Sequence, residues 1–279
     1  MVKQYRVSYG EDELLIETGK LAPQAGGAVT VRWGDTVVLV TATASKEPRL
    51  GVDFFPLTVD VEERRYAVGK IPGGFFKREG RPSTEAILNC RKIDRPLRPL
   101  FPEGYRNDVQ IVVMPLSSDQ EHDMDMISIV GASAALMISD IPFEIPVGAV
   151  RVGYIEGAFV INPTVSQMAK SDLDLALAGT AESILMIEVG ANELPEDLML
   201  EALHRGHEAI QGLIAFQHQM RQEIGKEKNP GQRYTLDPQV LSQVEALMGE
   251  PLRELVEQGL KRADRREQEE ALRERMFAQ

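Results

Sequence analysis

The first 62 residues alternate between apolar and polar positions, which is the pattern of half-buried β-strands. The alternation is clearest over residues 28–33, 36–43 and 54–61, and turn residues such as Gly26–Gly27 and Gly34–Asp35 separate these stretches. Strands joined by short turns pair most simply with their neighbours in opposite directions. We therefore predict an antiparallel start to the fold.

A loop rich in glycine and proline is predicted over residues 67–82, and a helix is predicted after it. Residues 83–93 have the spacing of apolar positions that is typical of a helix. We expect Pro96 and Pro99 to limit the extension of this helix, because proline lacks the backbone N–H that continues the helical hydrogen bonds.

The middle of the chain predicts a strand and then a buried helix. Residues 108–114 return to the pattern of a strand, whereas residues 126–138 are apolar on nearly every side of a helix. A helix without a polar face is expected in the interior of the protein. Further strands are predicted after it, over residues 148–154, 158–161, 173–178 and 184–189.

The last third of the chain is predicted to be helical and to contain a domain boundary. Residues 195–228 predict one long helix, and proline and glycine at 229–232 interrupt the helical pattern. We therefore predict one domain over residues 1–228 and a helical segment over 229–279. About fifty residues are marginal for an independent core, so this segment is expected either to dock on the first domain or to begin a larger helical domain.

The composition is that of an ordinary globular protein. The chain has 279 residues, of which 43% are hydrophobic and 27% charged, which excludes disordered, collagen-like and disulfide-rich classes. Cys90 is the only cysteine, so an internal disulfide and a multi-cysteine metal site are excluded. No apolar run approaches the roughly 20 residues that span a bilayer, and the N-terminus lacks the apolar segment of a signal peptide. We expect a soluble, cytoplasmic protein without a membrane partner.

The charge is unevenly distributed along the chain. The net charge is −12, yet eleven basic and only four acidic residues lie between Arg64 and Arg106. A solvated charged face explains such a segment as well as a surface for a polyanion does.

Aromatic side chains lie within this basic segment. Phe75 and Phe76 are followed by Lys77, Arg78 and Arg81 in the glycine-rich loop. Single-stranded nucleic acid binds such combinations, because bases stack on aromatic faces while cations follow the phosphates. The alternative is that both phenylalanines fill the core beneath the loop.

Arg91, Arg95 and Arg98 are spaced by four and then three residues, which places them on one face of a continuous helix. Three guanidinium groups close together suit phosphate recognition, because each offers a planar fork of donors. Pro96 would disturb that face, and pairing with nearby carboxylates such as Asp94 is the alternative.

Residues 121–125 contain carboxylates at alternate positions, which resembles a site for a hard metal ion. Acidic residues before a helix are also common because they favour the positive end of its dipole. The chain contains no Ser/His/Asp ordering, P-loop or dinucleotide-binding pattern. From spacing alone we predict an α/β protein with a phosphate or nucleic-acid site.

Several long motifs, taken together and in order, resemble the N-terminal half of bacterial polynucleotide phosphorylases. These motifs cover residues 67–82, 93–105, 131–136, 141–143 and 149–154. The resemblance implies an α/β fold of the α+β type: an RNase PH-like core over residues 1–228, with mixed and antiparallel sheets and packed helices. It also implies that residues 229–279 begin an all-helical linker domain.

The resemblance further implies 3′-to-5′ phosphorolysis of single-stranded RNA. Inorganic phosphate attacks the terminal phosphodiester and releases nucleoside diphosphates with the help of Mg²⁺ or Mn²⁺. A homotrimeric ring around an RNA channel is implied, with RNA-degradation proteins as further partners. The family's Phe–Phe–Arg–Arg loop at a channel constriction corresponds to residues 75–78, where Lys77 replaces the first arginine. Lysine keeps the charge but not the planar fork.

The chain departs from the family's catalytic pattern, which belongs mainly to a second RNase PH-like core. Asp123 and Asp125 stand where that core has phosphate-binding serines, and carboxylates there repel phosphate. Asp174 corresponds to one metal-binding aspartate, whereas Met168 stands in place of its partner. The resemblance therefore implies no catalytic residue within this chain, and leaves Asp123, Asp125 and Asp174 as weak metal candidates.

Three hypotheses follow. The first is that the chain is part of a longer phosphorylase and supplies surfaces for RNA guidance and ring assembly. The second is a non-catalytic oligomerisation module that makes no productive contact with RNA. The third is a self-sufficient phosphorolytic exonuclease that binds its metal at Asp123, Asp125 and Asp174.

Overall fold

The computed structural model describes residues 2–277. The chain divides into two compact units, the first ending at Arg233 and the second beginning at Tyr234. The first unit holds both β-sheets and the second is helical. None of the helices within residues 2–277 combines the length and apolar character needed to span a membrane.

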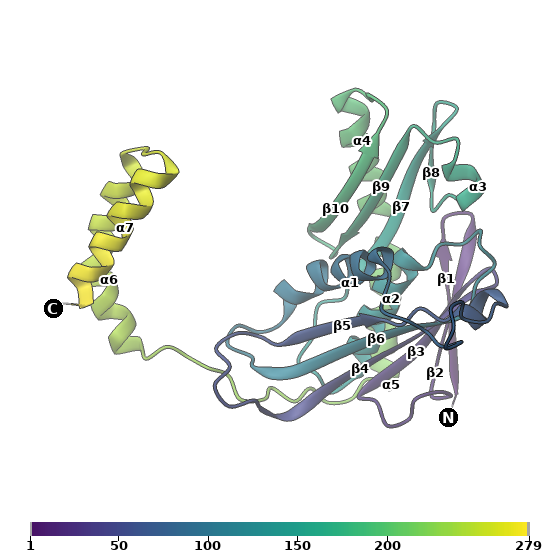
Figure 1. Cartoon of the computed structure of the whole chain (residues 1–279), viewed down its shortest axis with the longest axis horizontal. Coiled ribbons are helices and arrows are strands. Elements are labelled where there is room, and N and C mark those ends of the chain that lie inside the picture. The colour runs from purple at the N-terminus through teal and green to yellow at the C-terminus, as the bar shows by residue number, and fades with distance from the viewer. Residues whose placement is uncertain (1, 278–279) are drawn as a thin grey trace. The chain divides into compact units, whose positions relative to one another are not determined.

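The larger sheet of the first unit has six strands in the order β1-β2-β3-β4-β6-β5 (Figure 1). Its strands are β1 (Lys3–Tyr9), β2 (Asp12–Thr18), β3 (Gly27–Trp33), β4 (Thr36–Pro48), β5 (Leu57–Val61) and β6 (Asn107–Ser117). The chain forms β1 to β4 as an antiparallel meander, as predicted.

The prediction of an antiparallel start is wrong for β5. This strand begins at Leu57 rather than at residue 54, and it pairs in parallel with β6, Leu57 lying opposite Val109. Parallel neighbours need a long crossover, and here the crossover contains helix α1 (Thr84–Leu97). Alternation reports which side chains are buried but not the direction of the partner strand.

The smaller sheet has four antiparallel strands in the order β10-β9-β7-β8. Its strands are β7 (Gly148–Ile155), β8 (Ala158–Ile161), β9 (Leu173–Gly179) and β10 (Ile184–Ala191), with the short helix α3 (Val165–Met168) between β8 and β9. All four strands are confirmed at the predicted positions.

Helix α2 (Met124–Ile138) lies between the two sheets (Figure 1). Every residue from Asp125 to Ile138 is buried, which confirms the expected interior helix. The helix contacts β3 and β4 on one side and β7 on the other. A Cβ atom on Gly131 would lie only 2.7 Å from a methyl group of Val40, so the close approach of α2 to the larger sheet requires glycine there.

Pro96 does not end helix α1, contrary to the prediction. The helix runs through Pro96 to Leu97 and continues into the 3₁₀ turn η2 (Arg98–Leu100). Pro96 and Leu97 are both buried. The burial of their apolar side chains therefore offsets the one backbone hydrogen bond that proline removes.

The predicted long helix over 195–228 is two helices, α4 (Glu196–Ala209) and α5 (Gln211–Ile224). Ile210, between them, is completely buried and packs close to the backbone of Gly148 in β7. Inserting this side chain against the sheet turns the helix, so that α4 covers β7 and β9 while α5 packs on α2.

The second unit consists of helices α6 (Pro238–Glu257) and α7 (Arg262–Phe277), which pack on each other around Leu255 and Leu272. Apolar side chains on α6 remain exposed, among them Val240, Leu241 and Val256. The amphipathic helices are confirmed, whereas their assignment to a linker domain stays a prediction.

The segment after α5 is fastened to the C-terminal end of α2. The Lys228 ammonium donates to the carbonyls of Leu136, Met137 and Ser139 at 2.8, 3.0 and 2.8 Å. Burial, and then the charge of Arg221, lower the pKa of Lys228 to about 8. Lys228 is therefore still protonated at pH 7 and can donate all three hydrogen bonds, which a helix end needs where water is excluded.

Replacing Lys228 should destabilise the first unit. We expect Lys228→Met to lower the free energy of unfolding by about 1–3 kcal/mol, because buried carbonyls at the end of α2 lose their donor. Lys226→Met is the matched control, since Lys226 makes one exposed side-chain hydrogen bond, to the carbonyl of Gly26. Urea unfolding of both variants measures the difference, and equal losses would contradict the assigned role of Lys228.

Candidate nucleic-acid interface

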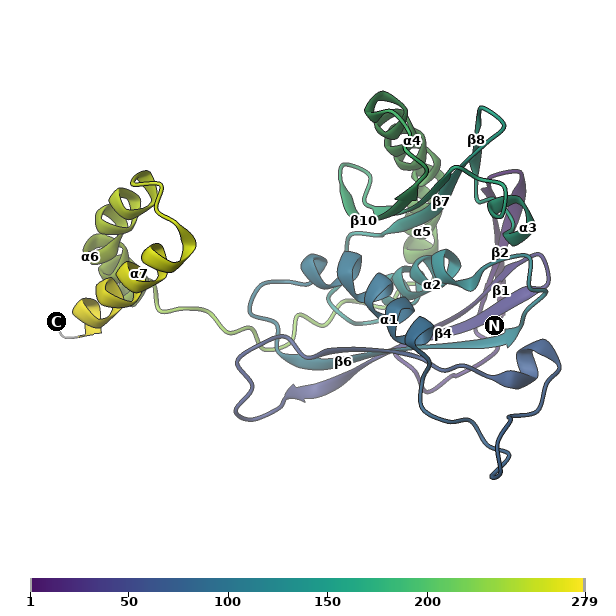
Figure 2. The same cartoon turned by 45° about the horizontal axis from the view of Figure 1, so that its top comes forward.

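The glycine-rich loop between the 3₁₀ turn η1 (Arg65–Val68) and helix α1 is fastened at both ends. Figure 2 shows this segment projecting away from the sheets. The Glu79 carboxylate accepts a hydrogen bond from the backbone N–H of Arg65 at 2.9 Å. The Glu63 carboxylate accepts from the N–H and the hydroxyl of Ser83, both at 2.8 Å. These contacts hold the base of the loop while its tip extends into solvent.

Phe75 and Phe76 form the aromatic tip of this loop. They are 92% and 74% exposed, and their rings meet edge to face with centroids 5.4 Å apart. The Arg78 guanidinium lies 5.1 Å from the centroid of the Phe76 ring. The exposure excludes the alternative that the two rings fill the core.

The cations of the loop are exposed beside the rings. Lys77, Arg78 and Arg81 are all exposed, and none of them forms an ion pair with another residue in the range 2–277. Lys77 has a φ of 49°, a left-handed conformation that is uncommon outside glycine. The loop thus presents two aromatic rings and three cationic side chains without carboxylate partners among the described residues. Proteins that bind single-stranded nucleic acid combine such groups, because the rings stack on bases and the cations contact phosphates.

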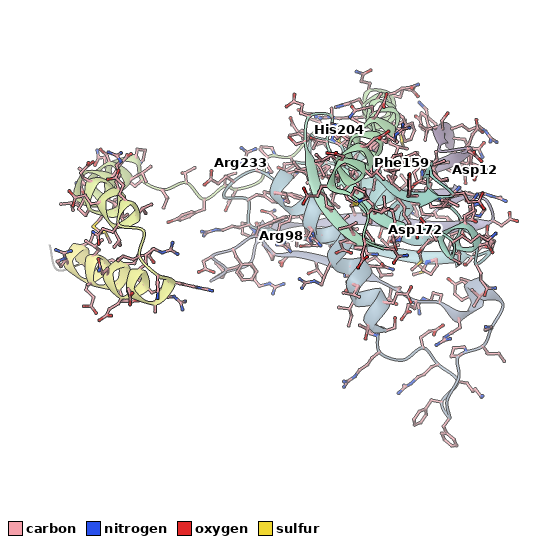
Figure 3. The ribbon with its side chains drawn as sticks, turned by 90° about the horizontal axis from the view of Figure 1, so that it is seen from above. Asp12, Arg98, Phe159, Asp172, His204 and Arg233 are labelled. Atoms are coloured by element: carbon pink, nitrogen blue, oxygen red, sulfur yellow. The ribbon has the colours of Figure 1, made fainter. Side chains whose placement is uncertain are left out.

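The three arginines of α1 differ in their surroundings. Arg91 is exposed and, within the described chain, has no carboxylate partner. Arg95 forms an ion pair with Glu188 of β10 at 2.6 Å. Arg98, labelled in Figure 3, pairs with Asp94 and also donates to the carbonyls of Phe55 and Leu57.

The predicted triple-arginine face is therefore only partly available. Arg98 binds the start of β5 and the residues before it to α1, and Arg95 binds α1 to the smaller sheet. The alternative of pairing with a neighbouring carboxylate is confirmed for Arg98 and Asp94. Phosphate binding by Arg91, Arg95 and Arg98 stays a prediction. A phosphate would compete with a carboxylate for Arg95 and Arg98, but with no described carboxylate for Arg91.

The weak metal candidates surround an arginine. The Arg151 guanidinium, from β7, forms ion pairs with Asp174 of β9 and with Asp125 of α2, the latter at 2.5 Å, and lies 3.9 Å from Asp123. Lys92 of α1 adds a second cation, 2.9 Å from Asp125. Burial raises the pKa of Asp125, but Arg151 and Lys92 more than offset it, so the pKa falls below its usual value.

A divalent metal does not fit this arrangement. Metal ligands need free carboxylate oxygens, whereas a guanidinium already occupies the position between Asp125 and Asp174. Met168 lines the cavity of about 200 Å³ beside Arg151, and its thioether is a poor ligand for hard cations. No group of three or more histidine, cysteine or acidic residues suited to a metal is present within residues 2–277. The arrangement therefore adds no support for a metal at Asp123, Asp125 and Asp174, which stays a hypothesis.

Sequence reasoning missed Arg151 and Lys92. The available signal was an arginine in the otherwise apolar stretch 149–154, where a charged side chain in a buried strand requires a partner. The partners themselves lie 23 and 26 residues away along the chain, in β9 and α2, and spacing does not connect them.

Two family profiles match the first unit. The first domain of the 3′ exoribonuclease family matches residues 13–142, and the second domain of the same family matches residues 146–209. Together they cover helices α1 to α4 and the strands of both sheets apart from β1. The chain belongs to the 3′ exoribonuclease family.

Relatives within this family are polyribonucleotide nucleotidyltransferases of bacteria. The chain is 55% identical to that of Heliobacterium modesticaldum over 244 residues, which is 88% of the chain and 34% of the relative. It is 51% identical to that of Shouchella clausii over 276 residues, 99% of the chain and 38% of the relative. It is 53% identical to that of Bacillus subtilis over 248 residues, which is 89% of the chain and 35% of the relative.

The chain thus spans about a third of the length of these relatives and matches their N-terminal portion. The fold is also found in the crystal structure of rice (Oryza sativa) Rrp46, with a TM-score of 0.57 and 14% identity. That likeness covers 78% of this chain and 93% of the rice chain, and at this identity it shows the RNase PH-like fold alone.

The arginines of α1 give a prediction that separates structure from binding. We expect Arg98→Ala to lower the free energy of unfolding by about 1–3 kcal/mol, because it removes charged hydrogen bonds between α1 and the segment before β5. Arg91→Ala should change stability by less than about 0.5 kcal/mol. Urea unfolding checks both values, and an Arg91→Ala variant as destabilised as Arg98→Ala would contradict the assignment.

Proposed function

We propose that this chain is the RNA-guiding part of a polyribonucleotide nucleotidyltransferase. The supporting observation is the exposed pair Phe75 and Phe76 at the tip of a fastened loop, with Arg78 beside it. An exposed aromatic pair is unfavourable in water unless a partner covers it. Bases of single-stranded RNA supply flat faces for the rings, and the backbone supplies phosphates for Lys77, Arg78 and Arg81.

In this proposal the whole protein degrades RNA from the 3′ end by phosphorolysis and releases nucleoside diphosphates. A divalent ion, Mg²⁺ or Mn²⁺, would stabilise the transferring phosphoryl group in a second core that this chain does not include. The chain itself holds the RNA backbone with the cations of the loop and of α1. Inorganic phosphate, further copies in a homotrimer and RNA-degradation proteins would be its partners, and the cytoplasm its location.

The loop proposal predicts a loss of RNA affinity without a loss of stability. We expect the double variant Phe75→Ala, Phe76→Ala to bind single-stranded RNA at least tenfold more weakly in filter binding, since stacking contributes roughly 1–3 kcal/mol per base. The slope of affinity against salt should be unchanged, because no phosphate contact is removed.

Phe54→Ala is the matched control for that measurement, because Phe54 is an exposed phenylalanine of another loop. The control should bind RNA as the parent does. RNA binding by the double variant equal to that of the parent, over a range of salt concentrations, would remove the proposed aromatic guide.

Assembly without RNA contact is the second candidate function. Apolar side chains are exposed on α1 at Ile87 and Leu88 and on β10 at Ile187 and Val189. Such side chains favour a protein partner when they gather on one face. Both candidate functions include assembly into a homo-oligomer, but this second one requires no contact with RNA.

Light scattering separates the two candidates. We expect the double variant Leu88→Lys, Val189→Lys to lower the apparent mass of any oligomer, because lysine at these positions would desolvate on association. If assembly is the sole function, adding RNA should leave the apparent mass of the parent's oligomer unchanged. If the chain also binds RNA, the apparent mass should rise. A parent that is monomeric at high micromolar concentration would contradict the assembly candidate.

A further inference from the structure

Arg151 occupies the centre of the most buried charge cluster of the first unit. Its side chain is only 15% exposed, and that of Asp125 is 3% exposed. Burying a charge is unfavourable unless it is paired and hydrogen-bonded. Arg151 meets this requirement through its ion pairs with Asp125 and Asp174. Its backbone N–H donates to the side-chain oxygen of Asn162 at 2.9 Å, and its carbonyl accepts from the backbone N–H of Asn162 at 2.7 Å.

The cluster connects elements that pack on different sheets. Asp123 caps the N-terminus of α2 and Asp125 lies in its first turn, whereas Arg151 and Asp174 belong to adjacent strands of the smaller sheet. Lys92 reaches the cluster from α1. A single guanidinium thus joins the start of the buried helix to the four-stranded sheet.

The charges are nearly balanced. Three carboxylates, of Asp123, Asp125 and Asp174, face two cations, Arg151 and Lys92. Removing the guanidinium would leave an excess of two negative charges, which equals the charge of a divalent ion. Oxygen ligands from carboxylates are those that Mg²⁺, Mn²⁺ and Ca²⁺ prefer.

We propose that Arg151 is a built-in counter-cation that does, in this chain, the electrostatic work of a divalent metal ion among Asp123, Asp125 and Asp174. It keeps metal ions out and fixes the N-terminus of α2 to β7 and β9. The cluster therefore differs from a metal site through Arg151 as well as through Met168, which lines the cavity beside it. The inference is independent of RNA guidance, because it concerns α2 and the smaller sheet rather than the loop.

Metal uptake by variants of the full chain tests the proposal. The variants are Arg151→Met, Arg151→Lys, the double variant Arg151→Met, Asp174→Asn, and the control Arg205→Met, which breaks an exposed ion pair on α4. Trp33, the only tryptophan, lines the cavity beside Arg151, so its fluorescence reports thermal unfolding near the cluster. Each variant is measured in EDTA and with MnCl₂.

We expect Arg151→Met to lower the Tm by about 10 °C in EDTA, because it leaves buried carboxylates unpaired. MnCl₂ in tenfold excess over its Kd should raise the Tm of this variant by about 3 °C or more. It should raise the Tm of neither the parent nor Arg205→Met. Arg151→Lys should have an intermediate Tm that does not respond to Mn²⁺, since the charge is retained without the planar fork.

The double variant decides whether the ion binds where we propose. Asp174→Asn in the Arg151→Met background should abolish the Mn²⁺ effect. Electron paramagnetic resonance of free Mn²⁺ gives a second measurement, with the signal reduced by Arg151→Met alone. Should Arg151→Met fail to fold in EDTA, refolding with MnCl₂ is expected to restore soluble protein.

Several outcomes would overturn the proposal. These are a parent that binds Mn²⁺ as well as Arg151→Met does, a Mn²⁺ effect that persists in the double variant, and no recovery by Mn²⁺ in any assay. A variant stabilised by lowering the pH to about 5 but not by Mn²⁺ would also overturn it, because protons rather than a metal would then neutralise the carboxylates.

Discussion

Helix α2 is buried from Asp125 to Ile138, so both sheets must cover it and the polar groups at its two ends need partners inside the protein. This requirement organises the first unit. At the N-terminal end the partners are Asp123 and Arg151, and at the C-terminal end the partner is Lys228. The two cations come from different parts of the chain, Arg151 from β7 and Lys228 from the segment after α5.

The cluster at the N-terminus of α2 shows how carboxylates of the kind that bind metals can instead pair with a buried arginine. Carboxylates near a helix start suit a metal ion or the capping of backbone N–H groups equally well. The guanidinium of Arg151 decides between them, because it fills the space between Asp125 and Asp174. The resulting ion pairs link the first turn of α2 to strands β7 and β9.

The exposed loop has the opposite physical character. Phe75 and Phe76 are among the most exposed apolar residues of the chain, on a segment whose base is held by Glu63 and Glu79. A fixed base and an exposed tip present aromatic faces without burying them in the core. The unit thus combines an interior in which the charges are paired with a surface loop in which Lys77, Arg78 and Arg81 form no ion pair with another described residue.

Side-chain alternation and apolar runs predicted most of the strands, the buried helix and the loop, because such patterns are local records of burial. Packing between segments distant in the sequence set the parallel direction of β5, the helical path through Pro96 and the turn at Ile210. Aromatic residues within a basic, glycine-rich stretch singled out Phe75 and its neighbours before any family motif did, whereas the pairing of Arg151 with Asp125 and Asp174 had to be seen in three dimensions. Ion-pair partners in different strands and helices meet through the fold, and no local pattern records which distant charge will fill a buried position.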